Sequence, residues 1–201
     1  MLCFFMMWFL PFIFLSRSGR LEIGIKRIEK PTWIWGALLL GAGGGIIVFI
    51  AGYVLFGNSE NNWYISMRNS FQIDKTMMEL PKIQLFLIYT FPALLFSPIG
   101  EEFFFRGIIH ESIKINWGQR IAVWINALAF SGIHAFHHGI YWDSTGIHVR
   151  IISGLLWFLI IMGLSWIFTK CREKSGSIWT SVIAHSAFNL SMNITIFLFL
   201  I

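Results

Sequence analysis

The amino-acid sequence predicts an all-α fold, namely a polytopic membrane helix bundle. Of the 201 residues, 56% are hydrophobic and only 12% are charged, and the mean hydropathy is +0.69. A soluble domain carries about 25% charged residues and could not bury this much apolar surface, so lipid must surround much of the chain. The apolar residues also form long uninterrupted runs, which are typical of membrane-spanning helices.

The apolar runs give the expected number of helices. The third run contains Pro92 and Pro98 and is too long for one straight crossing, so we expect either one kinked helix, which we favour, or two shorter ones. The first run is short for a full span and has no basic stretch before it, so we read it as a retained membrane segment rather than a signal peptide. We therefore expect about six transmembrane helices, or seven if the third run is divided. The runs are Met1–Leu15, Trp33–Phe56, Lys82–Ile113, Ile121–His137, Ile151–Phe168 and Ser177–Ile201.

The charged residues indicate how the chain sits in the membrane. Lysine and arginine gather in the loops after the first, third and fifth runs, and basic loops stay in the cytoplasm. The net charge of +5 is thus explained by the lipid bilayer as partner, and no nucleic acid is expected. We predict a multi-pass integral membrane protein, in the plasma membrane of a bacterium. Residues 1–80 would form N-terminal membrane helices and a loop, and residues 81–201 a catalytic helix bundle.

Ionisable side chains inside the apolar runs are few, and each is costly enough to be a functional candidate. Three of them, Glu101, His134 and His185, lie on different runs at matched depth. Each is roughly 17–21 Å of helix from an inner-side basic residue, at about 1.5 Å per residue, and therefore near the middle of the membrane. A shared site is expected.

The spacing of neighbouring residues divides this set. Glu102 and Arg106 are four residues apart and can form an ion pair on one helix face, whereas Glu101 points about 100° away and is left free to act as a general base. Two further pairs share a helix face at the same spacing, namely Phe130 with His134 and His185 with Asn189. Each residue alone also has a structural reading, as packing for Phe130 or as an interhelical hydrogen bond for the histidines and Asn189. Three other histidines, His137, His138 and His148, are expected in an outer loop.

Three motifs then resemble a known family. The segment SPIGEEFFFRG, Ser97–Gly107, resembles an E-E-x-x-x-R motif, LAFSGIHAF contains F-x-x-x-H, and SVIAHSAFNL contains H-x-x-x-N. The motifs, in this order, resemble those of the CPBP family. These are the CAAX proteases and bacteriocin-processing or self-immunity proteins, also called Abi. With about six crossings the chain is smaller than the eight-helix type II CAAX prenyl endopeptidases, which bears on whether its substrate is prenylated.

The resemblance implies an intramembrane endopeptidase that hydrolyses a membrane-associated or prenylated, CAAX-type protein or peptide. Glu101 would activate a water molecule and His134 would share the proton transfers. His185 and Asn189 would donate hydrogen bonds to the oxyanion, and Glu102 and Arg106 would hold the shape of the site. The family is often termed metalloproteases, and Glu101, His134 and His185 could in principle hold zinc; we slightly favour a site without a metal.

Two other classes of function remain open from the sequence. The first is a non-catalytic immunity or binding protein of the same family, which would tolerate the loss of Glu101. The second is an ion-coupled transporter that uses the buried charges as a relay. Such transporters usually carry repeats or broken helices in both halves, and here the buried polar residues lie only in the C-terminal half.

Overall fold

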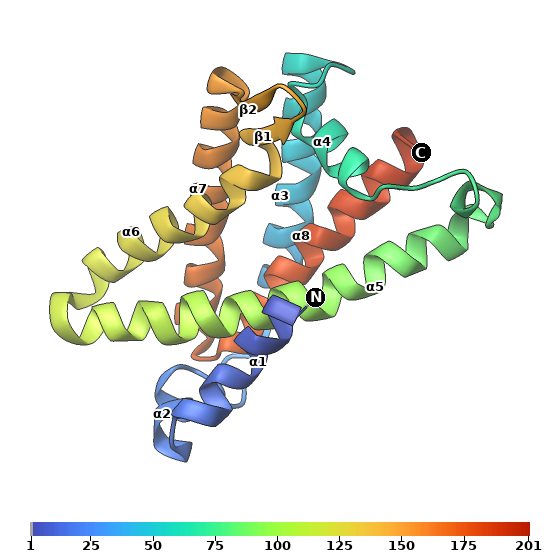
Figure 1. The fold of residues 1–201 in the computed structure, drawn as a ribbon. Coiled ribbons are helices and arrows are strands. Elements are labelled where there is room, and N and C mark those ends of the chain that lie inside the picture. Colours follow the sequence, from blue (N-terminus) through green and yellow to red (C-terminus); the bar gives the residue numbers. More distant parts are fainter. Residues whose placement is uncertain (1) are drawn as a thin grey trace.

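The computed structural model describes residues 2–201, with the side chain of Asp143 excepted, and consists almost wholly of helices (Figure 1). This confirms the predicted all-α membrane bundle, to which a short β-hairpin is added. The elements in chain order are α1 (Leu2–Phe14), α2 (Arg17–Glu22), α3 (Thr32–Phe56), α4 (Trp63–Ser70), η1 (Met77–Glu79), α5 (Lys82–Glu101), η2 (Glu102–Ile109), α6 (His110–His138), β1 (Ile140–Asp143), β2 (Gly146–Val149), α7 (Ile151–Ser175) and α8 (Ile178–Phe199).

Four helical stretches among the described residues are long and apolar enough to cross a membrane. They are α3, α7, α8 and Lys82–His138, the last of which turns at Gly118. The last of these contains α5, η2 and α6 and therefore comprises two of the expected runs. Helix α1 has 13 residues, fewer than the ~20 that a full span requires. The six expected segments are all present as helices, but the first is too short to cross alone.

The third run is one long helix that ends in a sharp reversal. Pro92 and Pro98 lie inside α5 without dividing it, and the helix extends into the segment 114–120, where a loop is expected and where the chain turns. The reversal occurs at Gly118, whose φ of 80° and ψ of 166° suit only glycine. At about 1.5 Å per residue, a helix from Lys82 to Gly118 is longer than the ~30 Å membrane core. It therefore crosses the bundle obliquely (Figure 1).

Helix α3 packs closely along α8 through glycines. A Cβ atom at Gly41 would collide with the backbone of Ala184, and one at Gly45 would collide with Ser191. Glycines four residues apart allow two membrane helices to approach to backbone contact. The N-terminal part of the chain thus supports the helix that carries His185, and the division at residue 80 stays a prediction.

Loops that are far apart in the sequence meet at two ends of the bundle. At one end the amides of Glu29 and Ile178 donate to the carbonyls of Ser175 and Gly24, at 3.0 and 2.9 Å. At the other end the ring of His138 hydrogen-bonds Ser66 at 2.8 Å. The basic loops after the first and fifth runs therefore lie at the same end.

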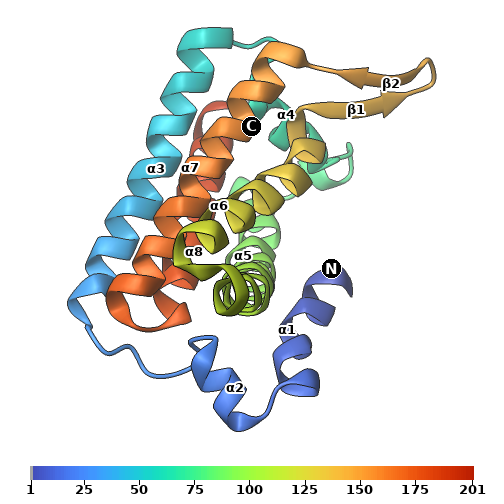
Figure 2. The same ribbon diagram turned by 90° about the vertical axis from the view of Figure 1, so that its left-hand side faces the viewer.

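The hairpin and the end of α6 differ from the expected outer loop. His137 and His138 belong to the last turn of α6, and His148 lies in β2. His138 is buried, because its ring nitrogens bond Ser66 and, at 3.0 Å, the hydroxyl of Ser153. Figure 2 shows the hairpin projecting from the bundle on the same side as α1.

Candidate active site

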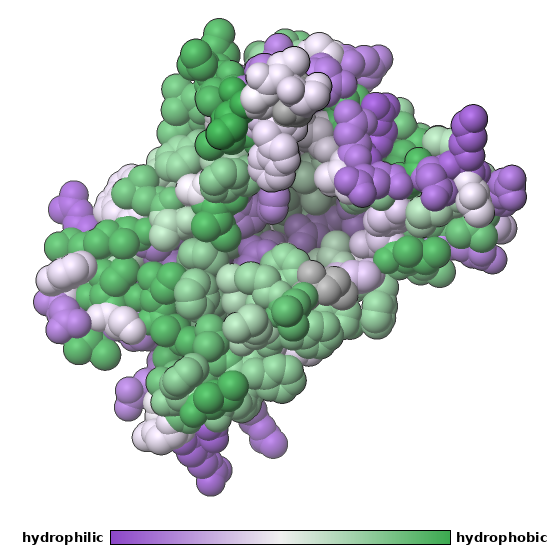
Figure 3. Space-filling model, in the orientation of Figure 1, coloured by the Kyte–Doolittle hydropathy of each residue, from purple (hydrophilic) through white to green (hydrophobic). Residues whose placement is uncertain are grey.

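A cavity of about 170 Å³ lies inside the bundle, and helices α5, α6, α7 and α8 supply most of its lining. Figure 3 shows a hydrophilic recess below the hairpin and above α1, with apolar surface to its left and below it. The structure brings the four predicted catalytic residues to the lining of this one cavity: Glu101, His134, His185 and Asn189.

Glu101 faces the cavity with one carboxylate oxygen held and the other free. The hydroxyl of Ser97, one turn earlier on α5, donates to Oε1 of Glu101 at 2.6 Å. Oε2 is buried without a hydrogen-bond partner among the described residues and lies 3.6 Å from Nε2 of His134. A free carboxylate oxygen beside an imidazole nitrogen is an arrangement that can accept the proton of a water molecule.

The orientation of His134 is set by its own helix. Its Nδ1 lies 2.7 Å from the carbonyl oxygen of Phe130, and since a carbonyl can only accept, Nδ1 must carry a proton. In the neutral imidazole Nε2 then presents its lone pair to Glu101. The indole of Trp157 on α7 donates to the carbonyl oxygen of His134 at 3.0 Å, which fixes this turn of α6 against α7.

Glu102 lies in a sealed, charge-paired environment instead. Its Oε1 accepts from Nη1 of Arg106 at 3.0 Å, and both side chains are fully buried. The same oxygen lies 2.9 Å from Nδ1 of His185. The ion pair expected from the four-residue spacing is therefore present, and it extends to a third residue on α8. Because a carboxylate accepts, Nδ1 of His185 is the donor in this bond.

Two phenylalanine rings enclose this charged group. The Arg106 guanidinium lies 4.0 Å from the centre of the Phe130 ring and 5.4 Å from that of Phe168. Phe130 also contacts the ring of His134, with centroids 4.3 Å apart, and Phe168 stacks on His185 at 4.9 Å. Aromatic faces attract a buried cation, so Phe130 does more than fill space.

Asn189 bonds to a helix that is locally opened by proline. Pro98 has no N–H, so the carbonyl of Leu94 loses its helical partner, and the hydroxyl of Ser186 on α8 donates to it at 2.8 Å. The neighbouring carbonyl, that of Ala93, accepts one N–H of Asn189 at 2.9 Å. The second N–H of the Asn189 amide is left for the cavity.

The first motif lies on a π-helix, which the sequence analysis did not anticipate. The backbone of Glu102–Ile109 has π-helical geometry, which is rare and occurs often at functional sites. The wider turn is held from outside, because the buried Arg172 donates through Nη1 to the carbonyl of Arg106 at 2.6 Å and through Nη2 to Glu111 at 2.7 Å.

The donor set does not form a metal site. Within residues 2–201 no group of three or more His, Cys, Asp or Glu side chains is placed to hold a metal ion. Glu101, His134 and His185 line one cavity, but their side chains are not grouped closely enough to share a metal ion. These residues do not fit the zinc considered above, so no step is derived through a metal.

The lining residues that the sequence analysis did not assign to the site include Ser97, His137 and Phe168. The ring of His137 is 4.9 Å from that of His134, edge to face. Ser97 is four residues before Glu101 and His137 three residues after His134, so helical spacing alone could have found both. Phe168 had no such signal, since it comes from a helix without a motif.

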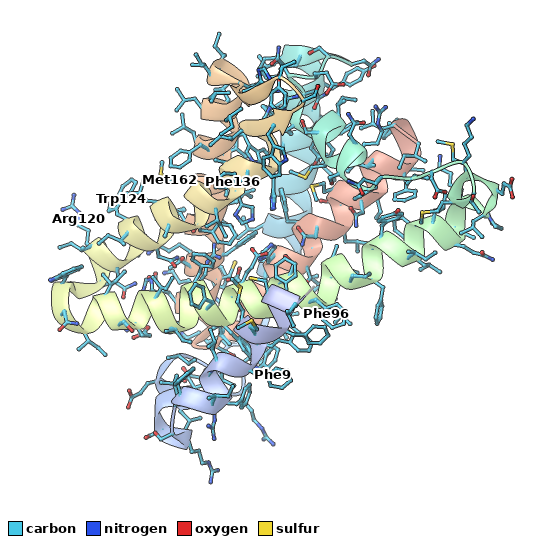
Figure 4. The ribbon with its side chains drawn as sticks, in the orientation of Figure 1. Phe9, Phe96, Arg120, Trp124, Phe136 and Met162 are labelled. Atoms are coloured by element: carbon cyan, nitrogen blue, oxygen red, sulfur yellow. The ribbon has the colours of Figure 1, made fainter. Side chains whose placement is uncertain are left out.

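Not all of α6 faces the site. Figure 4 shows Arg120 and Trp124 of α6 pointing away from the bundle.

The comparisons with known proteins bear on the same part of the chain. The family model described as type II CAAX prenyl endopeptidase Rce1-like matches residues 83–191, which is more than half of the 201 residues and includes all three motifs. Neither the comparison with curated proteins nor that with solved structures gave a significant match. The chain is thus an integral membrane protein of the CAAX protease type, and it belongs to the type II CAAX prenyl endopeptidase Rce1-like family.

Proposed function

We propose that this chain is an intramembrane endopeptidase that hydrolyses a peptide bond of a membrane-associated or prenylated, CAAX-type protein or peptide. The observation that carries the proposal is the free Oε2 of Glu101, buried at the cavity and 3.6 Å from Nε2 of His134. A water molecule that enters from the cavity and contacts both atoms can donate one hydrogen bond to each. It is then polarised for attack on a substrate carbonyl.

The reaction follows from the bonds that these groups make. As the water oxygen attacks the carbonyl carbon, one water proton passes to Glu101 and the carbonyl π electrons move to oxygen. The second N–H of Asn189 donates to that oxyanion. Protonated Glu101 then delivers its proton to the amide nitrogen, and the C–N bond breaks to give an amine and a carboxylic acid. His134 accepts the remaining water proton from that acid, which leaves as a carboxylate.

His185 supports the oxyanion from the same face of α8. Its Nδ1–H is directed to Glu102, so Nε2 donates a hydrogen bond only in the imidazolium form. The Glu102 carboxylate, itself paired with Arg106, stabilises that positive charge. With His185 protonated, the three side chains together carry one net positive charge, which favours the oxyanion.

The direct test is proteolysis by the purified protein in detergent or liposomes. The substrates are a farnesylated peptide ending in Cys-aliphatic-aliphatic-X, the same peptide without farnesyl, and an apolar membrane peptide, with products identified by mass spectrometry. Cleavage of at least one peptide by wild type, and none by a folded Glu101→Ala variant, is expected. Equal cleavage by both proteins would refute the proposal, and so would no cleavage by either.

A further inference from the structure

The β-hairpin lies directly above the mouth of the candidate active site. Helix α6 carries His134 and His137 at the cavity, and β1 begins at Ile140, less than one turn later. In both ribbon views β1 is the strand nearer to α4 and α5, and β2 is the farther one (Figures 1 and 2). The hydrophilic recess lies just below the hairpin (Figure 3).

The hydrogen-bond register identifies which backbone groups are open on each strand. The amide of Arg150 donates to the carbonyl of Gly139 at 2.8 Å, so residues 139 and 150 form a bonded pair. Bonded and non-bonded pairs alternate along an antiparallel ladder, and Trp142 opposite Ile147 is therefore a non-bonded pair. The N–H and C=O of Trp142 point out from the free edge of β1, and those of Ile147 from the free edge of β2.

The hairpin also exposes large apolar side chains on both of its strands. It forms a two-stranded sheet, which is only marginally stable alone. Trp142 and Ile147 are 73% and 78% exposed. An exposed apolar edge is a template for another strand.

A substrate segment needs such a template. A peptide bond within a helix is shielded by its own hydrogen bonds, so a membrane-bound substrate must be extended before attack. Extended backbone must then find other hydrogen-bond partners, because lipid offers none. Strand addition to a free sheet edge supplies them through main-chain bonds.

We propose that the free edge of β1 binds the substrate as an extended third strand and directs its scissile bond down to Glu101. This inference rests on the proposed function and names how that site holds its substrate. The occupant is a peptide segment leaving the membrane in extended form, recognised by its backbone rather than by one side chain.

Proline substitutions test the edge without disturbing the ladder, since proline removes only the N–H and is tolerated where that N–H faces outward. Trp142→Pro removes the outward donor of β1, and Ile147→Pro is the matched control on β2. We expect Trp142→Pro to lower kcat/KM for the fastest-cleaved peptide about tenfold, as for the loss of one hydrogen bond. Ile147→Pro should stay within about twofold of wild type.

A third variant separates strand pairing from simple anchoring in lipid. Trp142→Ala removes the ring but keeps the N–H, so it should retain near-normal kcat/KM if the backbone is what binds. An equal loss in Trp142→Ala and Trp142→Pro would overturn the inference in favour of membrane anchoring. Undiminished cleavage by folded Trp142→Pro would also overturn it, while leaving the proposed function intact. Wild type that cleaves no peptide would overturn both.

Hydrogen exchange gives a readout that does not depend on the proline variants folding. The full-length Glu101→Gln protein is incubated with the same peptide, which it should bind without cleaving. The amide of Trp142 should exchange more slowly with peptide present, and the amide of Ile147 should not. Unchanged exchange at Trp142 under saturating peptide would contradict strand addition.

Discussion

Glu101 and Glu102 are adjacent in the chain but lie in opposite surroundings. Each carboxylate has one buried oxygen without a hydrogen-bond partner among the described residues, but only Glu101 lines the cavity. The Glu102 side is sealed, with both members of its ion pair fully buried and His185 on the same oxygen. A carboxylate needs a free oxygen to take a proton from water, whereas one shared by a guanidinium and an imidazole stabilises structure and charge. Glu101 is therefore assigned the proton transfer from water, and Glu102 is assigned the structural role.

The largest expected effect on folding is at Glu102. Glu102→Gln leaves Arg106 as a buried cation without a charged partner, which costs about 3–5 kcal/mol when one member of a buried pair is removed. The melting temperature in detergent and the yield of folded protein measure this loss. An unchanged melting temperature would show that the buried pair of Glu102 and Arg106 does not stabilise the fold.

Replacing the whole pair provides the control. Glu102→Leu combined with Arg106→Met removes both charges, so part of the lost stability should return. The double variant should remain inactive, because His185 loses its carboxylate partner. A double variant no more stable than Glu102→Gln would contradict the pairing argument.

The next effect is expected at the oxyanion donor. Asn189→Ala should lower kcat by about 10²–10³, the loss measured for one oxyanion-hole donor in another protease. Asn193→Ala is the matched control, because Asn193 lies one turn later on α8 and its amide also bonds α5, at 3.3 Å to Thr90. Equal activity losses in the two variants would assign Asn189 to packing alone.

The smallest effect concerns the residue that orients Glu101. Ser97→Ala removes the 2.6 Å hydrogen bond to Oε1 and should lower kcat about fivefold, corresponding to roughly 1 kcal/mol, with KM unchanged. Ser97→Thr keeps the hydroxyl and should restore activity. Ser186→Ala, which removes a hydroxyl bonded to the Leu94 carbonyl, serves as the control for general helix packing. A rise in KM without a change in kcat would show that Ser97 does not orient Glu101 for catalysis.

The sequence predicted the parts of the site that depend on local spacing. The ion pair of Glu102 and Arg106 followed from helix periodicity and persists even though the backbone there is π-helical. The meeting of Glu101, His134 and His185 followed from depth, because membrane helices of known ends can be aligned by counting residues. The membrane normal gives all spanning helices a common axis along which depth can be compared, and a soluble fold has no such axis.

The remaining features depend on contacts between distant segments. A turn between the third and fourth runs was expected, but the sequence did not show that the helix would extend to Gly118 and reverse there at a positive φ. The stacking of Phe168 on His185 depends on how α7 packs against α8. The hairpin at Ile140–Val149 has strands of only four residues, so its segment was read as a loop. Helix rotation and strand edges are set by tertiary packing, which a single sequence does not display.

The most direct test of the account is the activity of Glu101→Gln per folded molecule. Glutamine keeps the shape of the side chain but cannot accept the proton of water. The account predicts a melting temperature close to that of wild type, together with cleavage of the best peptide reduced at least about 10³-fold. A folded Glu101→Gln variant that still cleaves, alongside a folded but inactive Glu102→Gln variant, would contradict it and transfer the catalytic role to Glu102.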